Sequence, residues 1–424
     1  MTTSHVPHVL LSAYQCSPTI KAVSQIGWQW YKRLAERCPV TLVTHIRNQA
    51  VLSQTGAPFE GSDIIYIDTE WLARPLYHWA NKLFPYSEHA IFLLSSLDFY
   101  VYDWLAVKQL RALQKQGRQW DIVHAVTPVS PKAYTRLHKL KRPILLGPWN
   151  GGLKIPAHFE DIMKQDASWI YSLRNLGKAL DFLFGSTRHA AALLTATQAT
   201  LDAIPKRYHS RCIPFLENGV DLDIFTPALW PPPPSATQPL EIVYVGRLLP
   251  FKGVPMLLKA IARFRQSHPV KLTLIGEGPL QHDWQALTTE LQLNDIVNWY
   301  GTACAAEIVQ QLHQSHVLCL PSIRESGGAV LLEAMACARP VLSINFGGPG
   351  EVIDETVGAL IEPDGVDAVI DGLVEQLHDI VQHPKKWQQR GITGRQRAEE
   401  RYGWEDKIEQ AIALYKRFLT TETE

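Results

Sequence analysis

The chain has 424 residues, a length that one hydrophobic core rarely organises, so the sequence predicts two domains. Its 41 lysines and arginines balance 41 aspartates and glutamates, and hydrophobic residues make up 46% of the chain. This composition is typical of a globular protein and disfavours a nucleic-acid partner bound through net charge, although it leaves room for a local basic patch.

The first residues, MTTSHVPHVLLSAY, lack the basic segment, long apolar core and small-residue cleavage site of a secretion signal. No uninterrupted apolar stretch reaches the ~18 residues that a membrane span needs. The six cysteines form no CxxC pair, which disfavours a zinc site and a disulfide framework. We therefore expect a cytoplasmic protein with reduced thiols and no bound metal.

Short apolar runs alternate with longer helical patterns through the first half of the chain. The runs predict buried parallel strands at residues 8–14, 40–46, 63–67, 121–127 and 143–148. Residues 70–106 are rich in tryptophan, tyrosine and phenylalanine. Aromatic side chains with polar tips suit an acceptor cleft or a membrane interface, and the alternative is a pair of helices with a packed core.

The stretch WPPPPSATQP, residues 230–239, cannot continue a helix or a strand, because each proline fixes φ and removes a backbone donor. It predicts a stiff linker, after which strands are expected at residues 241–246, 271–276, 296–301, 317–322 and 340–345. Residues 404–419 show the period of an amphipathic helix. The expected organisation is a Rossmann-like domain at 1–229, a linker at 230–240, a second Rossmann-like domain at 241–400, and a terminal segment at 401–424 that packs back on the first domain.

The stretch RESGGAVLLEA, residues 324–334, leads from an expected strand into a helix that should begin near Ser326 or Gly327. Glycines there let a ligand approach unpaired backbone N–H groups, and the helix dipole favours an anion. Eight helical residues would rotate Glu333 by ~80° from Glu325 over ~12 Å, so both carboxylates could face one elongated ligand. Carboxylates accept hydrogen bonds from sugar and ribose hydroxyls, and the alternative is that both are ordinary helix charges.

A second motif, VYVGRLLPFKG at residues 243–253, places Arg247 and Lys252 between an expected strand and an expected helix. Two cations at the carboxyl end of a strand suit a diphosphate whose negative charge grows as it leaves. The alternative is a surface loop with two ordinary basic residues. The order of residues excludes a Walker phosphate loop.

Together these motifs resemble retaining glycosyltransferases of family 4, with further matches in LIGEGPL at 274–280, ENGVDLDIF at 217–225 and GGPGEVI at 347–353. The resemblance covers nearly the whole chain. It implies an α/β protein of the GT-B class, with two Rossmann-like doubly wound domains facing a cleft, the first on the acceptor side and the second binding the nucleotide sugar. It implies no cofactor, since Arg247 and Lys252 would replace a divalent metal.

The resemblance also implies roles for individual residues. The catalytic set would be Glu325, Arg247, Lys252 and His124. The donor would be bound by Glu333 at its ribose, with the remaining contacts from Gly327, Gly328, Ala329, Val330, Gly246, Gly276 and Tyr300. The acceptor or phosphate loop of the first domain would contribute Gly27, Lys21, Asn150 and Gly151.

Two positions of the first domain leave alternatives open. Lys21, Val23 and Gln25 stand where the family's loop usually carries Gly, Glu and Gly, so Lys21 either blocks the approach to the donor phosphate or supplies a charge. His124 ends an expected strand where members of the family place a histidine that touches the donor sugar. The alternative is a structural histidine.

The expected function is metal-independent, retaining transfer of a hexose from a UDP-sugar or GDP-sugar to a glycan or lipid-linked acceptor, as in polysaccharide biosynthesis. A lipid-linked acceptor would bring a peripheral contact with the inner face of a membrane, and no nucleic acid is expected as a partner. The altered loop at Lys21 motivates the alternative, a GT-B scaffold or regulatory subunit without turnover. A sugar-nucleotide epimerase would fit the cleft but not the spacing of Glu325 and Glu333.

Overall fold

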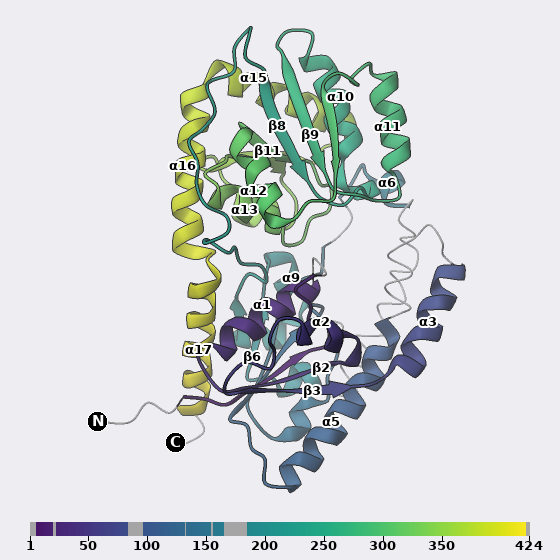
Figure 1. The fold of residues 1–424 in the computed structure, drawn as a ribbon, viewed down its shortest axis with the longest axis vertical. Coiled ribbons are helices and arrows are strands. Elements are labelled where there is room, and N and C mark those ends of the chain that lie inside the picture. Colours follow the sequence, from purple (N-terminus) through teal and green to yellow (C-terminus); the bar gives the residue numbers. More distant parts are fainter. Residues whose placement is uncertain are drawn as a thin grey trace. The chain divides into compact units, whose positions relative to one another are not determined.

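The computed structural model describes residues 6–19, 23–83, 96–131, 133–153, 156–164 and 185–420. These residues divide into two compact units, each built on one parallel sheet (Figure 1). The first unit holds the described residues up to Gly152, those from Gly185 to Glu217, and those from Glu405 onward. The second holds the described residues that follow Leu153 as far as Lys164, and those from Asn218 to Trp404.

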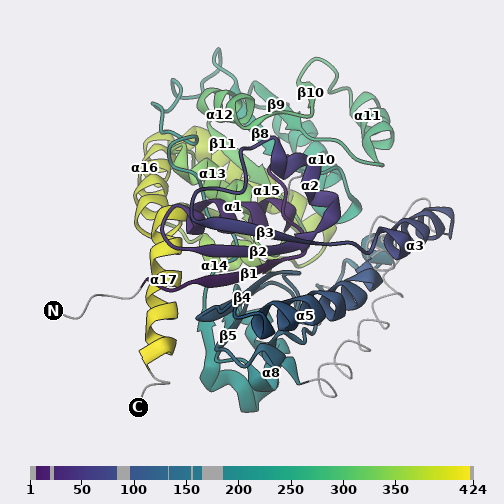
Figure 2. The ribbon, with the colours of Figure 1, turned by 60° about the horizontal axis from the view of Figure 1, so that its bottom comes forward.

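The first unit contains a seven-stranded sheet of order β3-β2-β1-β4-β5-β6-β7. Figure 2 shows β1 to β5 of this sheet side by side. Its strands are β1 (Val9–Ala13), β2 (Val40–His45), β3 (Ser62–Ile67), β4 (Ile122–Thr127), β5 (Ile144–Trp149), β6 (Ala192–Thr195) and β7 (Cys212–Pro214). The first five confirm the strands expected in this half. The strand order reverses between β1 and β4, so the carboxyl ends of these strands open the crevice in which such sheets bind ligands.

Helices cover both faces of the first sheet. They are α1 (Val23–Ala35), α2 (Gln49–Ser53), α3 (Glu70–Leu83), α5 (Phe99–Lys115), α8 (Ser186–His189), α9 (Gln198–Ala203) and the part of α17 (Trp404–Thr420) that begins at Glu405. Single 3-10 turns are η1 (Ile46–Asn48), η2 (Ser96–Asp98), η3 (Leu137–Leu140) and η5 (Lys206–Arg211). On one face, Tyr102 of α5 donates a hydrogen bond to the carbonyl of Val43.

The opposite face is covered by α1 and α17. Successive side chains of a strand point to opposite faces, so His124 of β4 points away from its neighbour Val123, which packs in the cluster of α5. His124 meets Trp30 of α1 and Tyr415 of α17. An ion pair of 3.1 Å from Arg33 to Glu405 joins the last turn of α1 to the first turn of α17.

The second unit contains a six-stranded sheet of order β10-β9-β8-β11-β12-β13. Its strands are β8 (Leu240–Val245), β9 (Val270–Ile275), β10 (Val297–Gly301), β11 (Val317–Leu320), β12 (Val341–Ile344) and β13 (Gly358–Ile361). The first five confirm the expected strands. The order reverses between β8 and β11, which places the ligand crevice of this sheet at their carboxyl ends.

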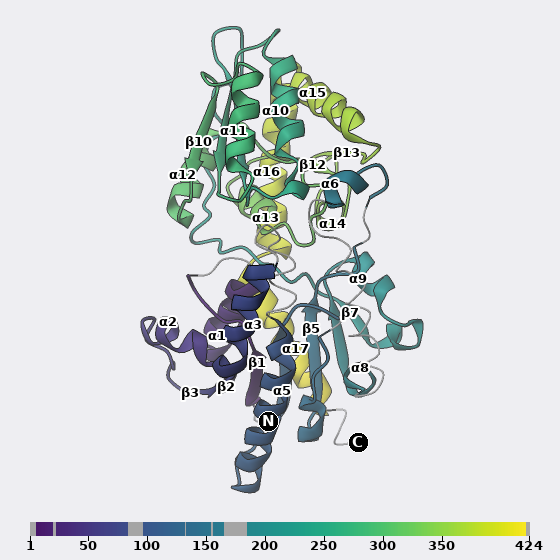
Figure 3. The same ribbon diagram turned by 90° about the vertical axis from the view of Figure 1, so that its right-hand side faces the viewer.

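The helices of the second unit pack in pairs, α10 against α15 and α13 against α16, and Figure 3 shows α10 beside α11. They are α6 (Glu160–Lys164), α10 (Val254–Phe264), α11 (Gln281–Glu290), α12 (Ala305–Gln314), α13 (Ala329–Ala336), α14 (Gly348–Val352), α15 (Val366–Gln382) and α16 (Pro384–Arg401), with the 3-10 turn η6 (Pro250–Lys252). Helix α6 comes from the first half of the sequence and packs against η6.

The proline-rich stretch lies along the second unit, whose longer segment begins before it, at Asn218. The indole of Trp230 donates to the carbonyl of His316 at 2.8 Å, and the His316 ring donates back to the carbonyl of Pro232 at 2.9 Å. Fully buried Arg339 donates to the carbonyls of Ala228 and Leu229. A buried guanidinium needs acceptors for its five N–H groups, and the carbonyls of Ala228 and Leu229 are two such acceptors. The unit boundary therefore differs from the expected linker position.

Candidate functional site

The loops at the carboxyl ends of β8, β11 and β12 lie against one another through their backbones. Gly253 has φ +69°, and a Cβ there would lie 1.9 Å from the carbonyl oxygen of Pro321. A Cβ on Gly347 would lie 2.2 Å from the carbonyl oxygen of Glu325, which also accepts a 2.9 Å hydrogen bond from the amide of Gly348. The two glycines are therefore required by close backbone approach. This packing builds one surface at the switch point of the second sheet.

Lys252 and Glu325 meet on this surface. The Lys252 Nζ lies 2.5 Å from the Glu325 Oε2, and the two side chains are 15% and 13% exposed. The structure thus joins the cation of one predicted motif to the carboxylate of the other. Because the pair is mostly withdrawn from water, its charges interact more strongly than a surface pair would.

Arg247 follows β8, and its side chain is exposed. Its own carbonyl oxygen accepts a 3.0 Å hydrogen bond from the hydroxyl of buried Tyr244. Burial, with the nearby Glu325 carboxylate, raises the pKa of Tyr244 well above its ordinary value, so this hydroxyl stays a donor. The Tyr244 hydroxyl thus fixes the loop that carries Arg247.

The two glutamates of the RESGGAVLLEA stretch do not share a helix. Helix α13 begins at Ala329, later than expected, because Gly328 adopts a left-handed conformation with φ 50° and ψ 50°. Glu325 therefore lies in the preceding loop and Glu333 on the helix, and the expected rotation of ~80° over eight helical residues was wrong. The buried glycines Gly327 and Gly328 lead directly to the first helical amides, those of Ala329 and Val330, which have no acceptor within the helix.

Two further glycines predicted at the donor site serve close packing. A Cβ on Gly276, at φ +133°, would lie 2.0 Å from the carbonyl oxygen of Gly246, and a Cβ on Gly246 would lie 2.8 Å from the Tyr244 hydroxyl. The loops after β8 and β9 are thereby joined.

Tyr300 lies on the edge strand β10, separated from β8 by β9, and its hydroxyl is 3.5 Å from the Glu307 Oε1.

His124 does not lie where the resemblance placed it. The residue is fully buried, and both ring nitrogens are used. The Nε2 donates to the carbonyl of Gly147 at 2.7 Å, because a carbonyl can only accept, and the Nδ1 accepts from the hydroxyl of Tyr415 at 2.7 Å. Burial lowers its pKa to about 4. His124 is a neutral core residue that joins β4, β5 and α17, and the expectation that it touches the donor sugar was wrong.

The remaining predicted residues of the first unit lie near the carboxyl edge of its sheet. Gly27 is buried inside α1, where a Cβ would lie 2.1 Å from the carbonyl oxygen of Gln15, so helix packing accounts for it. Asn150 directly follows β5 and donates from its side chain to the buried carboxylate of Glu217. The amide of Gly151 donates to Thr200 at 3.1 Å. Lys21 lies outside the described residues.

The sequence did not point to a polar network at the same edge of this sheet. Buried Asp98 accepts hydrogen bonds from the Tyr14 hydroxyl at 2.6 Å and from Arg47 at 3.1 Å. The ring of His45 accepts from the Arg47 amide and is also buried, which lowers the pKa of His45 to about 4. Arg47 itself is 41% exposed. The available signal in the sequence was that Arg47 directly follows a predicted strand. The network holds the Arg47 guanidinium at the edge of the crevice.

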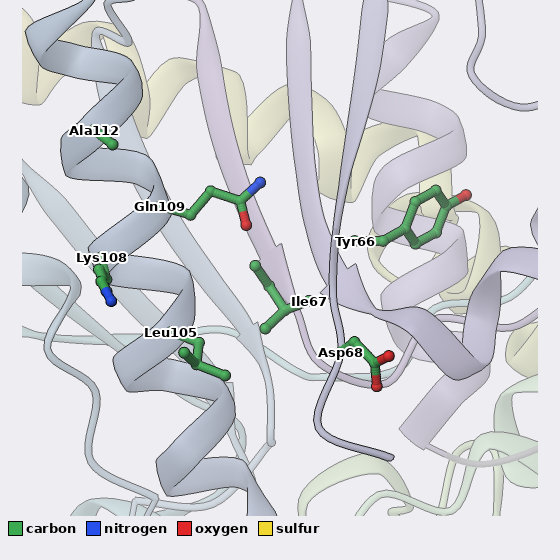
Figure 4. A pocket seen from close by; sticks show the side chains of 7 residues that line it. All are labelled: Tyr66, Ile67, Asp68, Leu105, Lys108, Gln109 and Ala112. Atoms are coloured by element: carbon green, nitrogen blue, oxygen red, sulfur yellow. The ribbon is translucent and has the colours of Figure 1, made fainter. Parts of the chain in front are cut away.

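A pocket of about 330 Å³ lies apart from these residues, between the end of β3 and α5. Figure 4 shows Leu105 and Gln109 of α5 facing Ile67 across it. None of the predicted site residues lines this pocket. In the described segments no three His, Cys, Asp or Glu side chains gather as metal ligands would.

Comparisons with known proteins bear on the second unit most strongly. Residues 231–394 match the family model of glycosyl transferases group 1. A glycogen synthase of Mycobacterium tuberculosis is 31% identical over 237 residues, which cover 54% of each chain. An MMP alpha-(1->4)-mannosyltransferase of Mycolicibacterium hassiacum is 28% identical over 241 residues, 55% of each chain. The chain thus spans about half the length of these relatives.

Two solved structures match nearly the whole chain. The sucrose-phosphate synthase of Thermosynechococcus elongatus has a TM-score of 0.61 at 19% identity and covers 98% of this chain and 100% of its own. Anabaena HepE, in complex with UDP and glucose, has a TM-score of 0.61 at 16% identity, with 96% and 99% covered. These likenesses concern the fold, and the prediction of two Rossmann-like units of the GT-B class is confirmed.

The core position of His124 predicts a pH dependence of stability. Its pKa is lowered on folding, so the unfolded chain binds more protons between pH 6.5 and 4, and stability falls as the pH falls through this window. Between pH 7.5 and 5, His124 should remove about 2 kcal/mol from the free energy of unfolding. Urea unfolding at both pH values should show a smaller loss in His124→Gln than in the parent protein.

The exposed His282 of α11 supplies the matched control, and His282→Gln should keep the parental loss. An equal loss in His124→Gln and in the parent protein would show that folding does not lower the pKa of His124.

Proposed function

We propose that this chain is a retaining glycosyltransferase that moves a hexose from a UDP-sugar or GDP-sugar to a glycan or lipid-linked acceptor, without a metal. The observation that carries the proposal is the pair of Lys252 and Glu325 at the switch point of the second sheet. The similarity of residues 231–394 to group 1 glycosyltransferases supports the proposal, because Lys252, Glu325 and the glycines around them lie within this range.

The chemistry follows from the charges at this surface. As the bond between the anomeric carbon and the diphosphate oxygen breaks, negative charge grows on the diphosphate. Lys252 and Arg247 supply positive charge there, and the amides of Ala329 and Val330 at the start of α13 add oriented donors. Glu325 and Glu333 accept hydrogen bonds from donor hydroxyls, Glu325 from the sugar and Glu333 from the ribose.

The Lys252–Glu325 contact also explains how the cation is held before the donor arrives. An ammonium that is 15% exposed would be costly without a counter-charge, and Glu325 provides one. A bound diphosphate offers a stronger counter-charge and frees the Glu325 oxygens for sugar hydroxyls. Binding of the donor and release of the Glu325 carboxylate from Lys252 then occur together.

The second candidate function is a scaffold or regulatory subunit without turnover. The departures at Val23 and Gln25, next to Lys21, favour it. The intact pair of Lys252 and Glu325 opposes it, because a scaffold does not need a partly buried cation at the diphosphate position.

The acceptor is proposed to lie at a membrane surface, which α3 would touch. Phe99 and Tyr102 of the aromatic region are buried in the core, as one alternative expected, while Trp71 and Trp79 of α3 are 67% and 69% exposed. These two tryptophans lie on the same side of the helix, and exposed Arg74 is one turn from Trp71 and pairs with Glu70. Exposed aromatic rings with cationic neighbours suit a membrane interface. No helix of the described chain has the length and apolar character of a membrane span.

A calorimetric titration of UDP, GDP and ADP and their hexose conjugates, with and without magnesium, tests the donor site. Micromolar binding of one uridine or guanosine diphosphate without magnesium is expected. Glu333→Ala should weaken this binding about tenfold or more, because the ribose loses its acceptor. Absence of binding by every nucleotide would refute the donor site and favour the scaffold.

Loss of the leaving-group cations should lower turnover. Lys252→Ala and Arg247→Ala should each reduce the rate of sugar transfer or donor hydrolysis ~100-fold, since each removes charge that acts mainly on the transition state. The exposed Lys259 of α10 gives the control, and Lys259→Ala should keep the parental rate. Parental turnover in both site variants would remove Arg247 and Lys252 from the mechanism.

Contact with a membrane is tested by sedimentation with phosphatidylglycerol vesicles. Trp71→Ser combined with Trp79→Ser should reduce the bound fraction at least fivefold, because two interfacial rings are lost. The control is Leu229→Ser combined with Ile392→Ser, which removes two exposed apolar side chains from the second unit. Equal binding by both double variants would contradict the role of α3.

A further inference from the structure

We propose that the amino edge of the first sheet carries a second anion site, which binds a phosphoryl group in a pocket lined by His138, Lys141, Arg142 and His189. The pocket encloses about 470 Å³ and is closed on one side by Phe418 of α17. This proposal does not depend on the glycosyltransferase assignment.

The first support is the distribution of charge along the sequence. Three segments precede β5, β6 and β7, at residues 133–143, 185–191 and 206–211, and none of them contains an aspartate or a glutamate. In a parallel sheet these segments meet at one edge, the amino edge. A chain of formal net charge +0 therefore concentrates basic residues here, and the nearest carboxylate the structure places against these segments, that of buried Asp103, is held by Thr135 and the Arg136 amide.

The second support is the state of the side chains that line the pocket. Among the described residues, Lys141, Arg142 and His189 form no ion pair with a carboxylate. The rings of His138 and His189 stack with centroids 4.7 Å apart. The Nδ1 of His138 is buried and has no hydrogen-bond partner within the described chain. Burial, followed by the charge of His189, lowers the pKa of His138.

Structural duties do not account for these cations. Arg211, which lies nearby, donates to the carbonyls of Arg188 and Ala190 and so has an anchoring role. Lys141 is exposed and adopts a left-handed conformation with φ 54°, which directs the chain sharply between η3 and β5. Arg142 makes one long contact of 3.4 Å to the Gln119 side chain. Two full charges therefore remain available to a ligand.

The number and kind of these groups select a phosphoryl anion. A phosphate dianion offers several acceptor oxygens to the Lys141 ammonium and the Arg142 guanidinium fork together, whereas a carboxylate carries one charge. The site is distinct from the proposed donor site, which lies at the carboxyl edge of the other sheet. The same chemistry belongs to a free phosphate ester and to a phospholipid headgroup.

Calorimetry with pyrophosphate at constant ionic strength tests the site. Lys141→Ala combined with Arg142→Ala should weaken binding at least tenfold, whereas Lys259→Ala combined with Lys385→Ala, which removes two exposed lysines elsewhere, should change it less than twofold. Pyrophosphate would also bind at the proposed donor site, so these variants are compared in a Lys252→Ala background, where the tenfold loss is expected because distant sites act independently. The single variant Lys141→Gln should lose less affinity for pyrophosphate than the double variant. Because Lys141 is exposed, this variant should fold normally, so its loss cannot be ascribed to misfolding.

Vesicles of phosphatidic acid, compared with vesicles of phosphatidylcholine, distinguish the two sources of the phosphoryl group. Binding of pyrophosphate that depends on Lys141 and Arg142 supports a soluble ligand, and binding of phosphatidic acid vesicles alone with the same dependence supports a headgroup. Equal binding by the pocket variant and the control variant in both assays would overturn the proposal, as would equal binding of acetate and pyrophosphate by the parent protein.

Discussion

Main-chain contact between loops is the constraint on which the second unit's site depends. The loops after β8, β11 and β12 approach so closely that Gly253 and Gly347 have no space for a side chain. Such contacts fix atoms more firmly than side-chain contacts do, because the backbone has few ways to adjust. Lys252 and Glu325, which are 73 positions apart, meet as a result of this packing. The site is therefore organised before any ligand enters.

Sequence patterns predicted most of the fold because strands covered on both faces read as continuous apolar runs, as VLLSA of β1 does. The strands ALLT of β6, CIP of β7 and GALI of β13 escaped prediction, although VLCL of β11 and VLSI of β12, with four residues each, were predicted. Length alone therefore does not explain the misses, and in β7 Pro214 also interrupts the apolar pattern. Short strands are held by their neighbours in the sheet. That information is absent from local sequence.

The errors at the site have similar causes. The pair Gly327 and Gly328 permits either a helix or a left-handed turn, and only the packing of the neighbouring loops decides between them. For His124, alternation along β4 shows which residues share a face, but not that α17 covers that face. The motifs assigned Lys252 and Glu325 to one donor site but did not predict their ion pair, and the pocket at Lys141 needed the sheet order to bring three basic segments together.

Helix α17 has a consequence for synthesis on the ribosome. His124 and Tyr415 are 291 positions apart, and the face of the first sheet that holds His124 lacks this cover until the end of the chain has been made. The second unit, whose last residue is Trp404, contains all of its strands before that point. The half of the protein that is translated first is therefore the half that completes its core last.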